Sequence, residues 1–233
     1  MTLCASFFSA ISTDIDTFHF ERTLAASGYG CVAGVDEAGR GPLAGPVVAG
    51  CVVLPPDCAY HRFKDSKKLS ATARQVLFAE LHACGAGIGF AVVSPQEIDQ
   101  VNILRASLLA MARAVAQLAG KLATGPDYLL VDGTFTAPVS LPQKALIKGE
   151  SKSASIAAAS IIAKVIRDRL MEEYHPQFPE YNFLQNKGYP TADHRRAIER
   201  FGPSAIHRRT FKGVREFVNG SAATPVPRQQ GLW

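Results

Sequence analysis

The stretch Val32-Ala-Gly-Val-Asp-Glu-Ala-Gly-Arg-Gly-Pro-Leu-Ala-Gly-Pro-Val-Val-Ala-Gly50 decides the fold of this 233-residue chain. Residues 31–35 are small or β-branched, as in a strand buried on both faces. Two adjacent carboxylates, Asp36 and Glu37, follow before the chain turns at glycine. Burying charge at a sheet edge is costly unless a cation or hydrogen bonds compensate it. The stretch therefore suggests a metal site, although an ordinary strand-to-turn junction with solvated acids has the same residues.

A second strand is predicted over residues 46–54, antiparallel to the first through the glycine-rich turn. Residues 128–132 form another short apolar strand, which again ends in a carboxylate, Asp132, and is followed by glycine. Parallel strands bring their carboxyl ends to the same edge of a sheet. We therefore expect Asp36 and Asp132 to meet at that edge.

The remaining elements follow from hydrophobic periodicity and from helix caps such as Ser70 and Ser94. Further strands are predicted at 88–93 and 145–148, and helices at 17–26, 71–83, 102–123, 151–174 and 191–201. This order predicts one α/β domain with a mixed five-stranded sheet flanked by helices. We expect a flexible segment at 1–17, a domain at 18–218 whose C-terminal helical part begins at about 175, and a disordered tail at 219–233.

Composition narrows the class of protein. Hydrophobic residues make up 47% and charged residues 19%, which argues against a disordered or fibrous chain. The net charge of +5 fits a polyanionic partner such as nucleic acid. Five cysteines without a C-x-x-C pair indicate neither a disulfide framework nor a zinc site, so a reducing, cytoplasmic setting is expected. The sequence has no apolar run long enough to span a bilayer.

Six motifs stand in order along the chain. They are Asp-Glu-Ala-Gly-Arg-Gly at 36–41, Asp-Ser-Lys-Lys-Leu-Ser at 65–70, Val-Asp-Gly at 131–133, Lys-Gly-Glu-Ser at 148–151, Ala-Ala-Ala-Ser-Ile-Ile-Ala-Lys-Val-Ile-Arg-Asp at 157–168 and Lys-Gly-Tyr-Pro-Thr at 187–191. Together they resemble bacterial ribonuclease HII, across about residues 18–215. The resemblance implies a ribonuclease H-like fold. It also implies an endonuclease that cuts RNA in RNA/DNA hybrids and incises duplex DNA at embedded ribonucleotides, leaving 5′-phosphate ends.

By the same resemblance, Asp36, Glu37, Asp132 and Glu150 are the catalytic carboxylates and hold Mg²⁺ or Mn²⁺. Glu150 is a departure, because the family usually has Asp in this Lys-Gly-Asp position. Its extra methylene has to be accommodated by an ion that wants oxygen ligands at short, fixed distances. We expect activity that is reduced or shifted toward Mn²⁺. The alternative is a catalytically impaired protein that binds hybrids without cutting them.

Adjacent acids on a regular strand point to opposite faces of the sheet. Asp36 and Glu37 can therefore share a metal only if the strand ends there or if Glu37 contributes its backbone carbonyl. Two-metal phosphoryl chemistry needs no protein nucleophile, in agreement with the lack of a Ser/His/Asp or Cys/His arrangement in the sequence. Asp168 is a competing fourth ligand. A surface ion pair is the preferred interpretation, because Arg167 and Arg169 flank it and Lys164 lies four residues earlier.

Telling RNA from DNA requires reading the 2′-hydroxyl. By resemblance, the backbone of Gly39, Arg40 and Gly41 and the Tyr189 hydroxyl perform this reading, and the tyrosine ring stacks on the next sugar. Without the resemblance, a tight turn and a packed aromatic would explain the same residues. Other substrate contacts could come from basic residues and a serine, namely Ser66, Lys67, Lys68, Lys148, Lys152, Lys187, Arg195, Arg196, Arg208 and Arg209. Of these, Ser66 and Lys67 are favoured because they lie in a shared motif.

One histidine and the C-terminal end of the chain also suggest contacts with the substrate or with a partner. His194 is a possible accessory group near the substrate. The end of the chain, Gln229-Gln-Gly-Leu-Trp233, has the form of peptides that dock on sliding clamps. We expect a monomer. A junction resolvase or transposase-like nuclease on the same fold is the other competing function, since fold alone does not fix substrate. The predicted 2′-hydroxyl sensor argues against such a nuclease, because an enzyme that acts only on DNA has no use for it.

Overall fold

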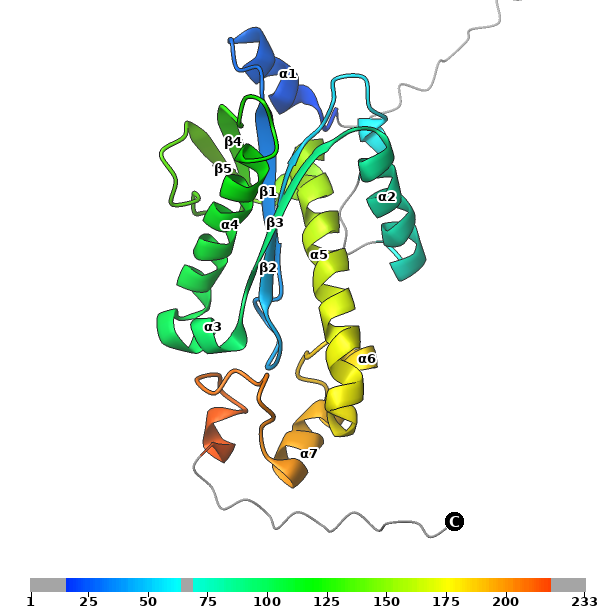
Figure 1. Cartoon of the computed structure of the whole chain (residues 1–233), viewed down its shortest axis with the longest axis vertical. Coiled ribbons are helices and arrows are strands. Elements are labelled where there is room, and N and C mark those ends of the chain that lie inside the picture. Colours follow the sequence, from blue (N-terminus) through cyan, green and yellow to red (C-terminus); the bar gives the residue numbers. More distant parts are fainter. Residues whose placement is uncertain (1–15, 64–68, 219–233) are drawn as a thin grey trace, which may run out of the picture.

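The computed structural model describes residues 16–63 and 69–218. Its centre is a five-stranded mixed sheet in the order β3-β2-β1-β4-β5 (Figure 1). The central strand β1 pairs antiparallel with β2 and parallel with β4, which in turn pairs parallel with β5. The strands are β1 Val32–Ala38, β2 Val47–Val53, β3 Gly87–Val93, β4 Tyr128–Asp132 and β5 Gln143–Leu146. This topology confirms the predicted α/β class and the mixed sheet. Ser66, Lys67 and Lys68, and the predicted termini before residue 16 and after residue 218, lie outside the described residues.

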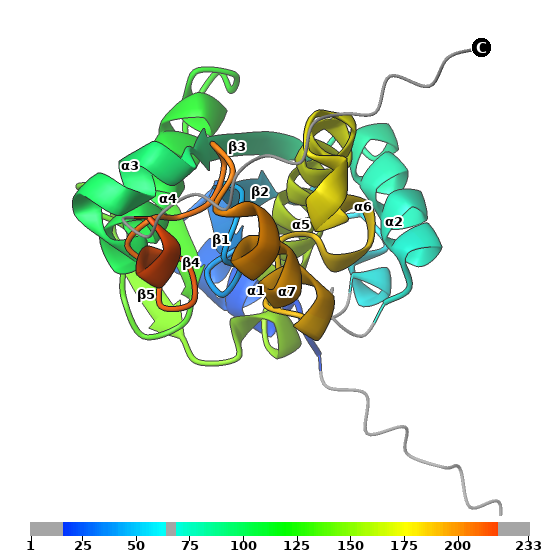
Figure 2. The same cartoon turned by 90° about the horizontal axis from the view of Figure 1, so that it is seen from below.

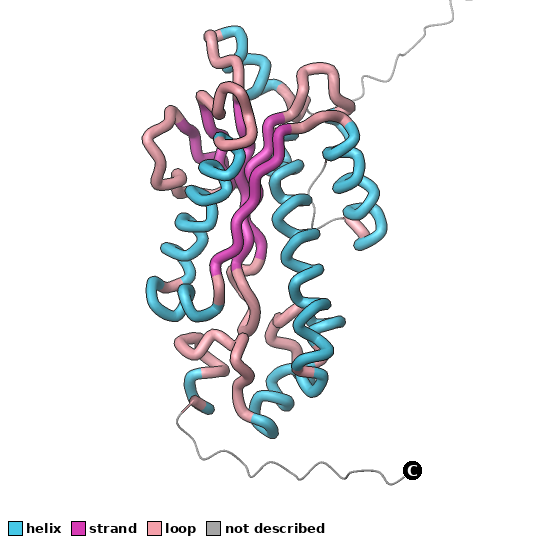
Figure 3. Tube along the Cα trace, in the orientation of Figure 1, coloured by secondary structure: helices cyan, strands magenta, loops and turns pink. Residues whose placement is uncertain are grey.

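Helices flank this sheet, and loops connect them (Figure 3). The α-helices are α1 His19–Ala26, α2 Ala71–Ala83, α3 Pro95–Val101, α4 Ile103–Ala119, α5 Ala154–Tyr174, α6 Phe183–Asn186 and α7 Ala192–Phe201. Short 3₁₀ turns occupy Tyr60–Arg62, Gly149–Ser151, His175–Gln177, Pro179–Tyr181 and Arg215–Phe217. The predicted caps are confirmed, because Ser70 accepts a hydrogen bond from the Ala73 amide and Ser94 forms a capping box with Glu97.

The helix predicted over 102–123 ends earlier than expected. Asn102 adopts a left-handed φ of 70° and caps α4 through its side chain, which accepts hydrogen bonds from the Leu104 and Arg105 amides. At its other end α4 stops at Ala119, where Gly120 follows.

In the described part of the chain no single helix is long and apolar enough to cross a membrane. Only α3 and α4 together reach that length and composition, and they are bent by 120° at their junction.

Two strands differ from their predicted bounds near the edge of the sheet that carries the carboxylates. The first strand continues beyond residue 35 to Ala38, because β2 keeps pairing with it as far as Ala38 and Val48. The fifth strand ends at Leu146, before Lys148 adopts a left-handed φ of 56° that a strand cannot accommodate. The helix predicted from 151 begins instead at Ala154, capped by Ser153, and a separate 3₁₀ turn holds residues 149–151.

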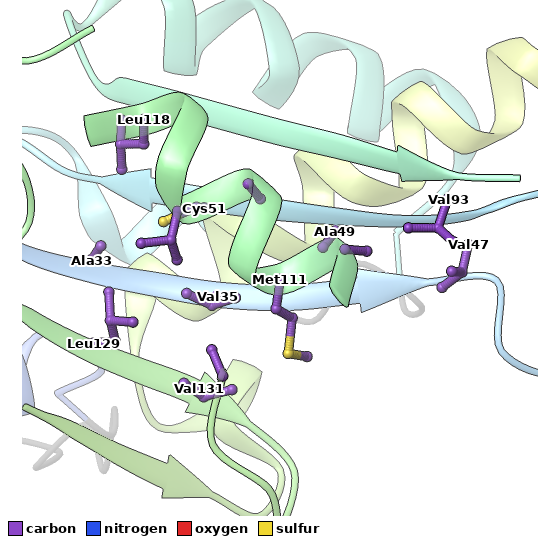
Figure 4. Close-up of a cluster of buried hydrophobic side chains, with 14 of the residues drawn as sticks. Ala33, Val35, Val47, Ala49, Cys51, Val93, Met111, Leu118, Leu129 and Val131 are labelled. Carbon is purple, nitrogen blue, oxygen red and sulfur yellow. The ribbon is translucent and has the colours of Figure 1, made fainter. Parts of the chain in front are cut away.

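The sheet lies between two helical layers (Figures 1 and 2). On one face α4 packs against small and branched side chains, including Ala33, Val35 and Leu129, which form a core cluster (Figure 4). On the other face lie α5 and α2. Here the backbone of α5 approaches so closely that a Cβ on Gly34 would stand 2.0 Å from the Ser155 carbonyl carbon. Glycine in β1 therefore permits the start of α5 to sit directly on the sheet.

The C-terminal helical part covers the end of the sheet to which β1 points (Figure 2). Its core contains Tyr181, Phe183 and Ile198 and receives Leu43 and Ala44 from the loop that follows β1. Ala44 also forms an isolated antiparallel bridge with His207. The loop between β1 and β2 is thus held between the sheet and the C-terminal part.

Candidate active site

Asp36 and Asp132 lie next to each other at the carboxyl ends of two parallel strands. The register pairs Val35 with Val131, and each aspartate is the next residue of its strand. The side chains of Val35 and Val131 both enter the core under α4, so the two aspartates point to the opposite face, toward α5. Neighbouring strands are about 4.8 Å apart. The predicted meeting of Asp36 and Asp132 at one sheet edge is confirmed.

Asp36 is buried in a strongly negative environment. Only 3% of it is exposed, and its Oδ1 accepts a hydrogen bond of 2.7 Å from the Glu37 amide. Burial, followed by the charges of Glu37, Asp132 and Glu150, raises the pKa of Asp36 well above its ordinary value. The charges of the other three predicted carboxylates therefore all influence Asp36, so the four groups lie in one region of the fold.

Glu150 reaches the same face from the 3₁₀ turn that precedes α5. Its side chain is buried, and its Oε2 accepts a hydrogen bond of 3.1 Å from the Ser160 hydroxyl on α5. The turn is tied to β4, because the Gly149 amide donates a 2.7 Å hydrogen bond to Asp132 Oδ1. A Cβ on Gly149 would stand only 2.6 Å from Ile156 Cδ1. Gly149 thus brings Glu150 close to Asp132 while leaving room for α5.

Glu37 belongs to the other face of the strand. It pairs with Ala49, whose side chain packs in the core under α4, so β1 remains regular through both acids. The Glu37 carboxylate turns toward Arg40 and accepts a hydrogen bond of 3.2 Å from Arg40 Nη1. The condition that the strand ends at Asp36 is therefore not met. The Glu37 backbone carbonyl is left as the route by which both residues would contact one ion.

The chemistry of the donor set fits a hard divalent cation. Carboxylate oxygens are the ligands that Mg²⁺ prefers, and like charges gathered around buried Asp36 are offset by a cation. Across residues 16–63 and 69–218, no three His, Cys, Asp or Glu side chains are placed so that they could hold an ion by themselves. Each of the four carboxylates instead accepts a hydrogen bond from the protein. Metal binding would replace part of this network.

A pocket of about 260 Å³ adjoins the carboxylates. It is lined by Glu37, Ala38, Gly39, Arg40, Gly41, Ser160, Lys164 and Tyr189. The three residues predicted to read a 2′-hydroxyl through their backbone and the predicted tyrosine therefore share one surface. Tyr189 is 42% exposed, and its ring lies 5.9 Å from both Lys164 Nζ and Arg167 Cζ. The structure thus places the predicted sugar-reading residues in one pocket, next to the predicted carboxylates.

The turn after Glu37 depends on Gly39. This residue has a φ of +101°, and a Cβ there would stand 2.2 Å from Arg167 Nε and 2.7 Å from the Pro46 carbonyl oxygen. Only glycine fits both the backbone conformation and the space. Gly41 is less confined, because its added Cβ would meet Tyr189 Cε1 at an ordinary 3.7 Å.

Two arginines in this region were missed or misjudged in the sequence. Arg208 was a candidate phosphate contact, but it is fully buried and donates to backbone carbonyls, so that prediction is wrong. Its position in a basic tract, beside Arg209, suggested surface. Arg167 is also fully buried. Its signal was its place within the 157–168 motif.

The interpretation of two other polar residues can now be decided. Asp168 forms an ion pair with Lys164 at 2.6 Å and lies 3.8 Å from Arg74, which confirms the ion pair. The prediction that the pair lies on the surface is wrong, since the two side chains are only 16% and 22% exposed. His194 is buried, and its Nδ1 lies 2.9 Å from the Tyr189 carbonyl oxygen. Its contact is thus with the backbone of the predicted sensor.

Comparisons with known proteins agree with this geometry. The family model described as ribonuclease HII matches residues 33–214. The ribonuclease HII of Desulfotalea psychrophila is 56% identical over 204 residues, which cover 88% of this chain and 90% of that protein. The solved structure of ribonuclease H2 from Pyrococcus horikoshii aligns with a TM-score of 0.65 and 29% identity, over 80% of this chain and 96% of that one.

A second solved structure, the PCNA:RNase HII complex from Archaeoglobus fulgidus, aligns with a TM-score of 0.65 and 27% identity. It covers 78% of this chain and 95% of that chain. The residues that the family model matches include the sheet, the carboxylate edge and most of the C-terminal part. On this evidence the chain belongs to the ribonuclease HII family and is a metal-dependent endonuclease that hydrolyses RNA in RNA/DNA hybrids.

Proposed function

We propose that this enzyme also incises duplex DNA at embedded ribonucleotides, and that it does so by two-metal phosphodiester hydrolysis at the carboxylate edge. The proposal rests on one observation: the carboxylates that would bind metal lie next to the pocket that would read the sugar. Asp36 and Asp132 lie side by side near the carboxyl ends of adjacent strands, on the face covered by α5, and the pocket of Gly39, Gly41 and Tyr189 opens beside them. A scissile phosphate at the carboxylates would place its sugar against that pocket.

Asp36, Asp132 and Glu150 would hold the ions through their carboxylates, and Glu37 through its backbone carbonyl. Bound Mg²⁺ or Mn²⁺ would supply an activated water and stabilise the leaving 3′ oxygen. The protein groups keep the carboxylates oriented, since the amides of Glu37 and Gly149 and the hydroxyl of Ser160 each donate to one of them. Such supporting hydrogen bonds fix ligand geometry.

Recognition of RNA would fall to the backbone of residues 39–41 and to the Tyr189 hydroxyl. Glycine on both sides of Arg40 lets the chain approach a sugar closely. The exposed Tyr189 ring would stack on the next sugar and read its position. Because a 2′-hydroxyl is both a donor and an acceptor, it can pair with a backbone amide or carbonyl that a deoxyribose leaves unsatisfied.

Loss of metal-binding carboxylates tests the assignment directly. We expect Asp36→Asn and Asp132→Asn to lose hydrolysis of an RNA/DNA hybrid by at least ~10³-fold while still binding it, since they keep the shape of the side chain but not its charge. Asp193→Asn is the matched control, because Asp193 is exposed on α7 and pairs only with Arg196 among the described contacts. Equal hydrolysis by Asp132→Asn and Asp193→Asn would refute the carboxylate assignment.

We also propose a protein partner for the C-terminal end of the chain. The Archaeoglobus fulgidus enzyme was solved in complex with PCNA, a sliding clamp. We propose that residues 229–233 give this chain a similar partner, and that deleting them abolishes clamp binding without affecting hydrolysis. Binding that survives the deletion would end this proposal.

The described cysteines Cys31, Cys51, Cys58 and Cys84 are free thiols, which supports a cytoplasmic setting. We expect the protein to be a monomer.

A further inference from the structure

Arg208 holds the loop that follows β1 from the inside. Its guanidinium is fully buried and donates to the backbone carbonyls of five loop residues. Nη1 donates to the carbonyls of Arg40 and Pro42, at 3.0 and 2.9 Å. Nε donates to Gly45 at 2.9 Å, and Nη2 to Gly39 and Pro46. Two of these carbonyls belong to the residues proposed to read the sugar.

Arg167 connects the same loop to the turn that carries Tyr189. From α5 its Nε donates to the Pro46 carbonyl at 3.0 Å and its Nη2 to the Ala44 carbonyl at 3.1 Å. Its Nη1 donates at 3.0 Å to the carbonyl of Lys187, two residues before Tyr189. Its guanidinium also lies 5.9 Å from the Tyr189 ring centroid. One side chain thus contacts both halves of the proposed reader.

Arg167 and Arg208 are held by backbone carbonyls. In the described part of the chain, neither guanidinium forms a salt bridge, and both are fully buried. Burial lowers the pKa of Arg167 to about 10 and that of Arg208 to about 9. A buried charge without a carboxylate is expensive, so its hydrogen bonds to carbonyls have to compensate for lost water. Ordinary packing does not need this arrangement.

We infer that Arg167 and Arg208 are positioning residues that fix the Gly39–Gly41 backbone relative to Tyr189 and thereby set the preference for a ribonucleotide. The inference rests on the proposed function. Arginine suits the task because its five N–H donors lie in a rigid plane and can satisfy several carbonyls at once. Lysine keeps the charge but has three donors on one flexible atom, so it cannot hold carbonyls that lie this far apart around the loop.

The test compares binding of two DNA duplexes that differ by one 2′-hydroxyl. Cleavage is blocked with Asp132→Asn, and Arg208→Lys and Arg167→Lys are each added to that background. Arg215→Lys and Arg169→Lys are the matched controls. Arg215 is exposed and paired with Glu216, and Arg169 of α5 donates an exposed hydrogen bond to Gln75 of α2. The quantity of interest is the Kd for the all-DNA duplex divided by the Kd for the ribonucleotide duplex. An unfolded fraction affects both constants equally and cancels in this ratio.

We expect either arginine variant to lower the ratio about tenfold, equivalent to about 1.4 kcal/mol, while both controls keep it. Loss of overall affinity with an unchanged ratio would show a structural role only and overturn the inference. If Arg208→Lys shows no cooperative thermal unfolding, Arg167→Lys decides, since it keeps all of the Arg208 contacts. A background protein that itself shows no preference would instead refute the proposed reading of the 2′-hydroxyl.

Discussion

The Nε2 atoms of His194 and His207 lie 2.9 Å apart, and their neighbours admit one arrangement of protons. The Ser204 amide donates to His207 Nδ1, so the proton of His207 must be on Nε2, from which it donates to His194. The proton of His194 is then on Nδ1 and is donated to the Tyr189 carbonyl. Both rings are neutral in this chain of hydrogen bonds, and a second proton on either would break it.

Stability should therefore fall in acid through His207. Burial, helped by nearby His194, lowers the pKa of His207 to about 3, against an ordinary value of 6.5. Between these values the unfolded chain takes up a proton that the folded chain does not, so stability decreases as the pH falls. At pH 5 the loss is about 2 kcal/mol. Burial also lowers the pKa of His194, which acts in the same direction.

Urea unfolding at pH 7 and pH 5 measures this effect, and His207→Gln is the comparison. The raised pKa of Asp36 opposes the trend, because folding then favours the protonated acid, but both proteins share that contribution. We expect the pH dependence of the free energy of unfolding to be about 2 kcal/mol smaller in the variant. Equal dependence in the two proteins would show that His207 is not held neutral.

Glu150→Asp should change the metal preference. The longer Glu150 side chain is held by the Ser160 hydroxyl, and shortening it moves the carboxylate by one methylene. We expect the variant to be faster in Mg²⁺ and to lose any advantage in Mn²⁺, since Mg²⁺ tolerates less deviation from octahedral geometry. Steady-state hydrolysis in each ion measures the ratio. An unchanged rate and ratio would mean that Glu150 is not an unfavourable replacement.

Ser160→Ala should weaken metal binding without destroying the fold. Its hydroxyl donates to Glu150 Oε2, and losses of such supporting contacts cost about 10–100-fold in metal affinity. Titrating the rate of hydrolysis with Mg²⁺ gives the apparent affinity. Ser107→Ala is the control, because Ser107 is a buried serine that donates to Ile103 on α4, on the other face of the sheet. The same metal dependence in both variants would exclude a supporting role for Ser160.

Gly39→Ala should reduce kcat/KM by at least ~10-fold, because the new methyl group has to displace Arg167 from the loop. Gly28→Ala isolates this contact. Gly28 has a similar φ of +96° but open space around its added Cβ, so it suffers backbone strain alone, of about 1–2 kcal/mol. If both variants lose stability equally and keep full activity, the position of the turn does not matter for hydrolysis.

Much of the sheet could be predicted from local pattern. The strand over 128–132 and the helix over 71–83 have the predicted bounds, because clear apolar runs and caps define them. The prediction that Asp36 and Asp132 meet needed only the parallel pairing of their strands. Bounds were wrong for the strand predicted over 145–148, which ends before Lys148 with its φ of 56°, and for the helix predicted over 102–123, which ends at Ala119.

The site was harder to predict where long-range contacts decide it. Nothing in the local sequence distinguishes buried Arg208 from its neighbour Arg209, because the carbonyls that Arg208 satisfies are more than 160 residues away. The opposite faces of Asp36 and Glu37 followed from strand geometry. The sequence could not show whether the first strand ends at Asp36, because its pairing with β2 extends it to Ala38.

Single-turnover incision of two matched DNA duplexes, one with a single ribonucleotide and one without, tests the central claim most directly. Each is measured in Mg²⁺ and in Mn²⁺, with Asp132→Asn as the inactive reference. We predict one cut, beside the ribonucleotide, in at least one of the two ions, and no cut in the all-DNA duplex. Tight binding without incision in either ion would contradict it and favour the hybrid-binding alternative. Equal cutting of both duplexes would contradict the reading of the 2′-hydroxyl.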